Sequence, residues 1–187
     1  MGMSERDTES TGTTCYNTLL YINAHGQIVG KHRSLLLTGA ERLVWAQGDG
    51  STLQVHKLPL ATISGLIGGE HYLPLPRTLV NPGSRRCGMA LHATDIADSY
   101  SFKQRFSIEG EAWIHPGDSV VVNPNGEFIV GPVRAREEAL YAQIDPQQVS
   151  GPRWMLDVTG HDARPDIFHL TIRREPHTII QAGEIAH

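Results

Sequence analysis

The sequence feature that most constrains the fold is a short apolar run that ends in two glycines and a carboxylate. Residues 63–67 (Ile-Ser-Gly-Leu-Ile) are followed directly by Gly68, Gly69 and Glu70. A run of this length, bounded by glycines, is typical of a buried strand that ends in a sharp turn. In α/β enzymes a nucleophile often sits in such a turn. Here the turn position is Gly68, which has no side chain and cannot act as a nucleophile.

Length and composition predict one globular domain without an obvious charged partner. The 187 residues can bury a substantial core, and 40% hydrophobic with 19% charged residues is ordinary for a globular protein. The net charge of -4 favours neither nucleic acid nor an anionic membrane as a partner. No apolar run is long enough to span a membrane, and the polar start lacks the apolar core of a signal peptide. Cys15 and Cys87 form no CxxC motif, so we expect a reduced, cytoplasmic protein without a cysteine-based zinc site.

Strand-like patterns outnumber helical ones along the chain. Alternating apolar residues and intervening turns predict two hairpins, one closed at 23–26 and one at 123–126. Residues 1–14 are polar and predicted to be irregular, 72–80 can hold at most a short helix, 95–111 is loop-like, and 145–149 starts a helical turn. The expected strands are 16–22, 27–31, 52–58, 61–67, 87–93, 119–122, 127–130, 139–144 and 167–173.

Several motifs along the chain resemble those of the nitrilase branch of the carbon–nitrogen hydrolases. They occur in the family's order, and the resemblance covers roughly residues 1–77 and 85–175, which makes it far more specific than one short pattern. The motifs are Tyr-Asn-Thr-Leu-Leu-Tyr-Ile at 16–22, Gly-Lys-His-Arg at 30–33, the segments 38–45 and 47–53, Pro-Gly-Asp-Ser-Val-Val at 116–121, Gly-Pro at 131–132, and 157–166.

The resemblance implies an α+β fold that is a partial, strand-rich α-β-β-α sandwich. An incomplete carbon–nitrogen hydrolase domain would occupy residues 1–175, with a C-terminal tail at 176–187. The family has a helix, a strand and another helix where this chain has only 78–84. Seven residues are too few for a crossover between parallel strands, so we expect one strand and its helices to be missing after residue 77. Uncovered edges and faces would then favour association with other chains.

The resemblance also implies a reaction, the hydrolysis of a small nitrile to a carboxylic acid and ammonia without a cofactor. In the family a cysteine thiolate forms a thioimidate, a glutamate acts as general base, and a lysine stabilises the developing charge. The cysteine position is Gly68 in this chain, the lysine position is Ser34, and nothing in residues 1–15 resembles the segment that carries the base. Glu41 matches a second active-site glutamate, and we assign it as the retained catalytic acid. Glu70 matches the acid two positions after the nucleophile, and we assign it to substrate binding.

Other residues offer weaker substitutes for the missing groups. Cys87 follows two arginines, which favour a thiolate, but a free cysteine in a strand is usually a buried packing residue. Ser34 and His32 would share one face of a strand, but no orienting acid accompanies them. His161 and Asp162 fit a hydrogen-bonded turn better than a metal site, so no metal is expected.

Three interpretations of the whole chain therefore stay open. The chain is an inactive member of the family, or a non-catalytic subunit in a homo- or hetero-oligomer with nitrilase-like chains, or a remnant that folds poorly. For Glu41 the alternative to a role in the site is a surface carboxylate paired with Arg33 or Arg42.

Overall fold

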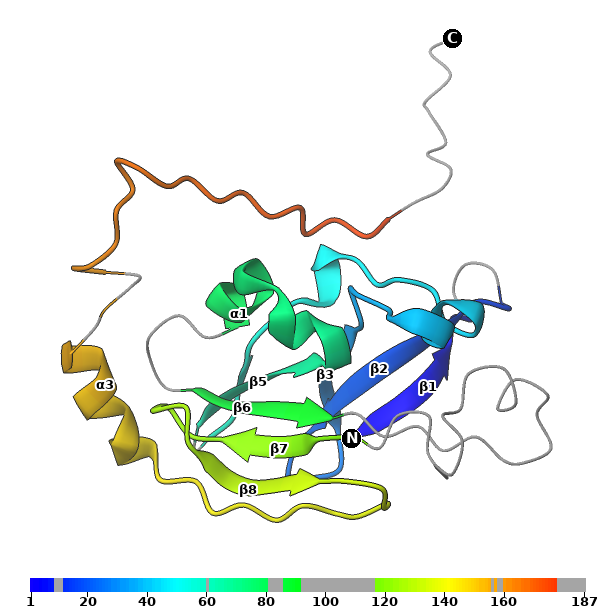
Figure 1. Ribbon diagram of the computed structural model, residues 1–187, viewed down its shortest axis with the longest axis horizontal. Coiled ribbons are helices and arrows are strands. Elements are labelled where there is room, and N and C mark those ends of the chain that lie inside the picture. Colours follow the sequence, from blue (N-terminus) through cyan, green and yellow to red (C-terminus); the bar gives the residue numbers. More distant parts are fainter. Residues whose placement is uncertain are drawn as a thin grey trace, which may run out of the picture.

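The strands of this protein form two separate sheets. The computed structural model describes residues 1–8, 12–59, 61–80, 86–91, 117–155, 157 and 160–177. The first sheet has the order β1-β2-β3 and the second the order β4-β5-β6-β7-β8 (Figure 1). The strands are β1 (Gly2–Arg6), β2 (Cys15–Ile22), β3 (Ile28–Arg33), β4 (His56–Lys57), β5 (Thr62–Ile67), β6 (Arg86–Leu91), β7 (Ser119–Val122) and β8 (Phe128–Val133). The helical elements are the 3-10 turns η1 (Gly39–Leu43), η2 (Gly50–Thr52), η3 (Gly68–Tyr72) and η4 (Pro146–Val149), and the helices α1 (Pro74–Val80) and α3 (Ser150–Met155).

Both predicted hairpins are confirmed. Asn23 closes the turn between β2 and β3, because its side-chain oxygen accepts hydrogen bonds from the backbone N–H groups of His25 (2.9 Å) and Gln27 (3.0 Å). Asn123 does the same between β7 and β8, accepting from the N–H groups of Asn125 and Glu127. This use of an asparagine side chain is the reason why that residue is common in turns. Local sequence therefore fixes these two connections.

The N-terminal strand β1 corrects the expectation of an irregular segment over residues 1–14. It pairs antiparallel with β2, with Gly2 opposite Leu19 and Arg6 opposite Cys15. The strand has no alternation of apolar residues, and its contacts with the neighbouring strands include ionic ones made by Glu5. Glu5 of β1 accepts hydrogen bonds from Thr18 of β2 (2.8 Å) and from Lys31 and Arg33 of β3. One carboxylate thus ties the three strands together.

The second sheet contains a crossover that the sequence did not predict. β5 and β6 are parallel neighbours, paired from Thr62–Arg86 to Ile67–Leu91. The chain between them runs over 68–85 and includes η3 and α1, which is long enough for a crossover. The connection is long enough because it begins at Gly68, whereas residues 78–84 alone are too few for the helix, strand and helix that the resemblance implies there, so the loss of one strand and its helices stays a prediction. The short helix predicted within 72–80 is confirmed as α1.

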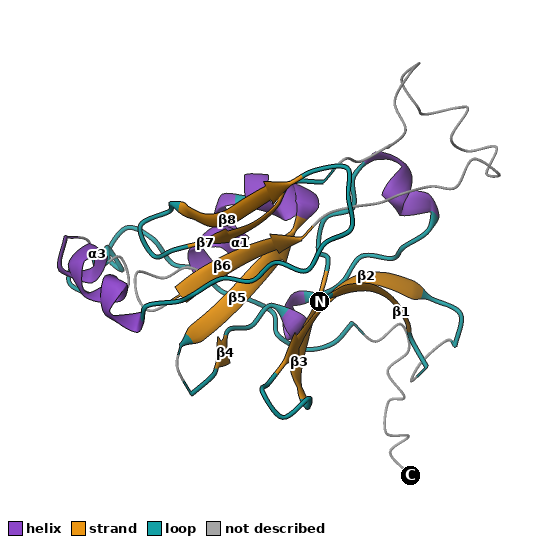
Figure 2. Ribbon diagram, turned by 90° about the horizontal axis from the view of Figure 1, so that it is seen from below, coloured by secondary structure: helices purple, strands orange, loops and turns teal. Residues whose placement is uncertain are grey.

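The two sheets pack face to face, and α1 covers the opposite face of the five-stranded sheet (Figure 2). Leu19 and Tyr21 of β2 contact Ile67 of β5 in one buried cluster, against which Ile63 also packs. The hydroxyl of Tyr21 donates to the carbonyl oxygen of Gly65 at 3.5 Å. A second cluster joins Leu53 and Leu66, with Leu35 against it. The described part of the chain is thus a partial, strand-rich α-β-β sandwich, as expected.

Three other predicted strands fail wholly or in part. Only His56–Lys57 of the expected strand 52–58 is a strand, and residues 139–144 and 167–173 pair with no strand in the described part of the chain. Apolar alternation produces a strand only where a neighbouring backbone is available to pair with it. The predicted strand over 87–93 is confirmed as β6, and the helical turn over 145–149 as η4. The expected loop 95–111 lies outside the described residues.

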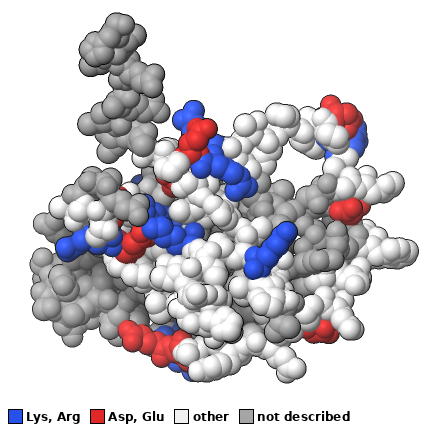
Figure 3. Space-filling view, turned by 180° about the vertical axis from the view of Figure 1, so that it is seen from behind, with Lys and Arg blue, Asp and Glu red and all other residues white. Residues whose placement is uncertain are grey.

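Charges of both signs occur on the face shown in Figure 3. Figure 3 shows basic and acidic side chains interspersed among neutral ones on the face it presents. Among the described residues, no helix is long and apolar enough to cross a bilayer.

The Glu5 network predicts a pH-dependent contribution to stability. Burial alone would raise the pKa of Glu5, but hydrogen bonds from Arg33, Lys31 and Thr18 outweigh it and lower the pKa from 4.5 to about 2. The folded state therefore binds the proton less readily than the unfolded state, and the stabilisation is complete above pH 4.5 and is lost as the pH falls to about 2. We expect Glu5→Gln to lower the free energy of unfolding at pH 7, as measured by urea titration. The difference in this free energy between the variant and the wild type should become smaller below pH 4.5. Asp118→Asn, which breaks an exposed pair with Arg134, is the control and should have little effect.

Candidate functional site

The candidate site lies at the C-terminal end of β5, where the chain turns sharply into η3. Gly68 begins the turn with a φ of +51°, in the left-handed region that glycine adopts without a steric penalty. The turn predicted from the sequence is confirmed. A side chain at this position would be disfavoured by roughly 1 kcal/mol in the absence of compensating contacts.

The neighbouring glycine is covered by the loop that follows β3. A Cβ atom on Gly69 would lie 2.9 Å from Cγ2 of Thr38 and 3.1 Å from Cδ2 of Leu36. The first separation is shorter than real Cβ contacts and the second is tighter than most of them. A larger residue 69 would therefore require the side chains of Leu36 and Thr38 to shift.

Ser34 is buried just after β3, and its polar groups are already used. Its hydroxyl donates to the carbonyl oxygen of Leu36 at 3.2 Å, its N–H donates to Asn17 at 2.9 Å, and its carbonyl oxygen accepts from Gly48 at 2.7 Å. His32 does not activate this hydroxyl, because its Nε2 faces Glu70 and its Nδ1 has no hydrogen-bond partner. The serine–histidine pair considered from the sequence is not formed.

Glu70 is fully buried and binds groups from two distant segments. Its carboxylate accepts hydrogen bonds from the backbone N–H of Ile67 (2.6 Å), the backbone N–H of Leu35, and Nε2 of His32 (2.9 Å). A carboxylate has only acceptor sites, so His32 must donate from Nε2. This arrangement holds the end of β3 against the turn after β5. A role for Glu70 in substrate binding stays a prediction.

Glu41 is also buried, which argues against the alternative of a surface carboxylate. It lies in η1 and accepts hydrogen bonds from the backbone N–H (2.7 Å) and the hydroxyl (3.0 Å) of Thr38. This is a capping box, in which a carboxylate satisfies a backbone donor at the start of a helical turn. The two arginines considered as its partners bind elsewhere, since Arg33 pairs with Glu5 and Nε of Arg42 donates to the carbonyl oxygen of Leu37.

The structure therefore brings the four sequence-predicted positions into one region. Ser34 precedes the loop that covers Gly69, Glu70 binds the backbone of Leu35 in that loop, and Glu41 binds Thr38 at its end.

Sequence reasoning missed His56 and assigned no role to Tyr21, although it weighed His32 as a partner of Ser34. His56 of β4 lies 4.0 Å from Tyr21, measured between ring centroids, and fits over Gly30, whose Cβ would collide with the imidazole. Burial and then the charge of His32 lower the pKa of His56 from 6.5. Burial also raises the pKa of Tyr21 above its ordinary value. His32 lies within the Gly-Lys-His-Arg motif, but no pattern in the sequence points to His56.

Neither cysteine nor the expected turn at His161 and Asp162 adds chemistry to this region. Asp162 accepts from the N–H of Asp157 at 2.7 Å, and Asp157 accepts from the N–H of His161 at 3.3 Å, so the predicted hydrogen-bonded turn is confirmed. The described residues contain no group of three or more His, Cys, Asp or Glu side chains that could hold a metal ion. Cys15 lies outside the region, and the side chain of Cys87 lies outside the described residues.

The hydrogen bonds of the two buried acids predict different costs of removal. Glu70→Ala would leave two backbone donors and a buried imidazole unpaired, so we expect it to reduce the free energy of unfolding by about 3–5 kcal/mol. Glu41→Ala removes a cap and should cost about 1 kcal/mol. Guanidinium titrations at pH 7 measure both. Equal and small losses in the two variants would contradict this description of Glu70.

Comparison with known proteins places this architecture in a family. No protein-family model matches the chain. Among curated proteins, it is 32% identical to an aliphatic nitrilase from Sinorhizobium fredii over 212 residues, covering 96% of this chain and 66% of the relative. It is 30% identical to nitrilase 2 from Arabidopsis thaliana, covering 94% of this chain and 60% of the relative. The chain thus spans less than two thirds of the length of these relatives.

Solved structures give the same fold at lower identity. Nit3 of Saccharomyces cerevisiae, a member of branch 10 of the nitrilase superfamily, superposes with a TM-score of 0.58 at 18% identity, covering 87% of this chain and 64% of that structure. A carbon–nitrogen hydrolase from Helicobacter pylori gives 0.57 at 16% identity, covering 82% of this chain and 64% of that structure. On the relatives and the shared fold together, this chain belongs to the nitrilase superfamily of carbon–nitrogen hydrolases.

Proposed function

We propose that this chain is a nitrilase-family protein that does not hydrolyse nitriles by itself. The observation that carries the proposal is that none of the four positions Ser34, Glu41, Gly68 and Glu70 presents a free reactive group. Gly68 offers no nucleophile, and the polar groups of Ser34, Glu41 and Glu70 are buried and hydrogen-bonded to neighbouring protein groups. None of them is left to act on a substrate in this arrangement.

The chemistry of the family's reaction explains why these losses matter. A thiolate that attacks a nitrile carbon forms a covalent thioimidate and divides one difficult hydrolysis into two easier steps. The hydroxyl of Ser34 is neutral and donates to Leu36, so it cannot replace a lysine ammonium as the group that stabilises developing negative charge. The retained acids then have no nucleophile to assist.

The length of the alignment supports a shortened domain. The alignment with the Sinorhizobium relative runs over 212 residues, whereas only 96% of the 187 residues of this chain take part in it. The relative therefore has residues inside the aligned span that lack a counterpart here. Such a gap fits the proposal that one strand and its helices are missing after residue 77.

We expect no ammonia release above the buffer control when the purified chain is incubated with small aliphatic and aromatic nitriles. The curated relatives named above include an aliphatic nitrilase, which makes small nitriles the substrates to test. Cys87→Ala is the matched variant, because Cys87 follows the arginine at position 86 and is the cysteine that could replace the nucleophile. If the wild type hydrolyses a nitrile and Cys87→Ala abolishes this activity, the proposal is wrong.

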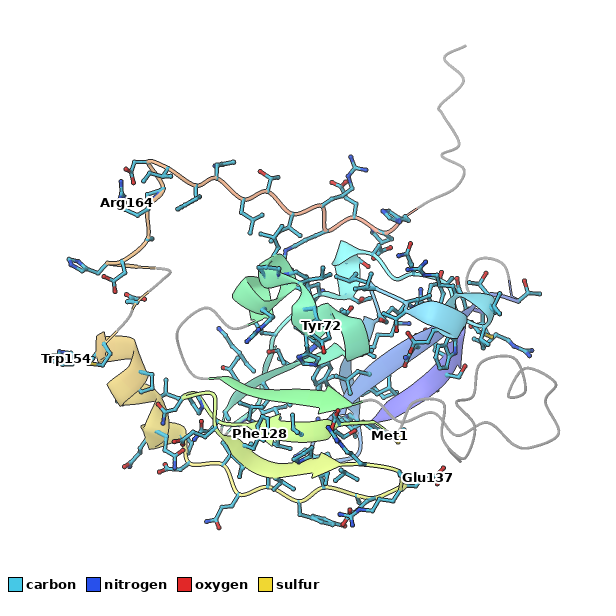
Figure 4. The ribbon with its side chains drawn as sticks, in the orientation of Figure 1. Met1, Tyr72, Phe128, Glu137, Trp154 and Arg164 are labelled. Carbon is cyan, nitrogen blue, oxygen red and sulfur yellow. The ribbon has the colours of Figure 1, made fainter. Side chains whose placement is uncertain are left out.

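A second candidate function is that of a non-catalytic subunit that binds nitrilase-like chains. The observation in its favour is a group of exposed aromatic side chains in the C-terminal third. Tyr141 is 88%, Trp154 86% and Phe168 75% exposed, and Figure 4 shows Trp154 on the side of α3 that faces away from the sheets. Aromatic residues of this kind are enriched where proteins bind one another.

Light scattering coupled to size exclusion tests this second candidate. We expect the wild type to elute as a species larger than the 20.6 kDa monomer, or to co-elute with a full-length nitrilase that is added to it. The double variant Trp154→Ser, Phe168→Ser should weaken that association, whereas Val44→Ser, at an exposed apolar residue in another region, should not. A wild type that stays monomeric both alone and with the full-length chain would count against a subunit role.

A further inference from the structure

Polar contacts between the two sheets are concentrated in one buried group of side chains. We call Tyr21, His32, His56 and Glu70 the intersheet cluster. Tyr21 and His32 belong to the three-stranded sheet, His56 belongs to β4 of the five-stranded sheet, and Glu70 lies in the turn after β5. All four side chains are buried. The cluster therefore joins the two layers next to the apolar contacts of Leu19 and Ile67.

Two contacts within the cluster cross from one sheet to the other. His32 donates from Nε2 to Glu70, and the imidazole of His56 stacks on the ring of Tyr21 with the ring planes inclined by 35°. His56 can lie this close because Gly30 of β3 has no side chain. Both histidines thus act as bridges between layers.

Each bridging histidine keeps one buried ring nitrogen without a hydrogen-bond partner. These atoms are Nδ1 of His32 and Nε2 of His56. In a neutral imidazole, leaving an acceptor nitrogen without a hydrogen bond has a small free-energy cost. Protonation would instead create a buried N–H donor without an acceptor, together with a positive charge away from water. The cluster is consequently compatible with neutral His56 and is destabilised by its protonated form.

The charged groups around His56 do not relieve this penalty. His32 of β3 and Tyr21 of β2 face it, and Glu70 of η3 is already shared among His32 and two backbone donors. Lys31 and Arg33 of β3 point to the other face of the strand and bind Glu5. From β5, the residues paired with β4 are Thr62 and Ile63, which carry no charge.

We propose that the intersheet cluster is a pH-sensitive switch that loosens the packing between the two sheets on mild acidification while the hydrogen-bond ladder within each sheet persists. The direction of the pH effect depends on which state of the cluster, closed or opened, binds a proton more readily. The lowered pKa of His56 means that the opened cluster, with an ordinary pKa near 6.5, binds a proton more readily than the closed one. The closed state therefore has its full stability above pH 6.5 and loses stability as the pH falls below that value. Burial lowers the pKa of His71, beside Glu70, and so adds to the same trend.

Amide hydrogen exchange of the full chain, resolved to single residues, tests the switch. The reporters are the N–H groups of Leu35 and Ile67, which donate to Glu70 at the junction of the sheets. The reference is the N–H of Asp7, which donates to the carbonyl oxygen of Thr14 at 2.8 Å beside the β1–β2 pair of the three-stranded sheet. Between pH 7.5 and about pH 5, a range in which carboxyl groups remain ionised, we expect the protection factors of the two reporters to fall by up to tenfold per pH unit. The protection of Asp7 should not change.

Variants separate the switch from ordinary acid unfolding. His56→Phe keeps a ring against Tyr21 but cannot take up a proton, and it should reduce the pH dependence of the reporters. His25→Gln, in the exposed β2–β3 turn, is the matched control and should leave that dependence unchanged. His56→Gln serves as a second neutral variant if the phenylalanine variant does not fold. Equal loss of protection at Asp7, reporter protection that does not depend on pH, or an unchanged pH dependence in both His56 variants would each overturn the proposal.

Discussion

The buried carboxylate of Glu70 is the contact on which the arrangement of this protein most depends. It lies in η3, just after β5, yet it binds the imidazole of His32 in β3 and the backbone of Leu35 in the loop that follows β3. Removing such a carboxylate lowers the free energy of unfolding by more than its hydrogen bonds add to it, because the buried donors would be left without acceptors. Glu70 thereby holds the start of the loop that contains Leu36 and Thr38, the two residues that lie over Gly69.

This dependence changes how the retained acids of the family are understood in this chain. A carboxylate beside a nucleophile is usually explained by its chemistry. In this chain the neighbouring residues are glycines, and both Glu70 and Glu41 satisfy backbone N–H groups. Acids that stabilise a turn in this way are useful to the fold whether or not the chain is active. Their presence is therefore no argument for activity.

The sequence predicts the parts of this fold that depend on neighbours in the chain. The two hairpins are closed by their own asparagines, and β5 is bounded by its own glycines. β1 was missed because Glu5 is stabilised by residues 26 and 28 positions away. Residues 167–173 have the apolar pattern of a strand, but a strand also needs a partner, which the local pattern cannot reveal. The positions of the site came from motifs, but the contact between Glu70 and Leu35 spans 35 residues and is a property of the folded chain.

The parallel pairing of β5 with β6 has a consequence for how such a chain can arise. Its register is continuous over six residue pairs, from Thr62–Arg86 to Ile67–Leu91, without a bulge. Backbone ladders carry no side-chain code, so a strand accepts a new neighbour provided that the alternation of its two faces is kept. If an internal strand–helix unit were lost from such a sheet, the flanking strands could pair with each other only in a register that keeps the two faces of each strand on their own sides.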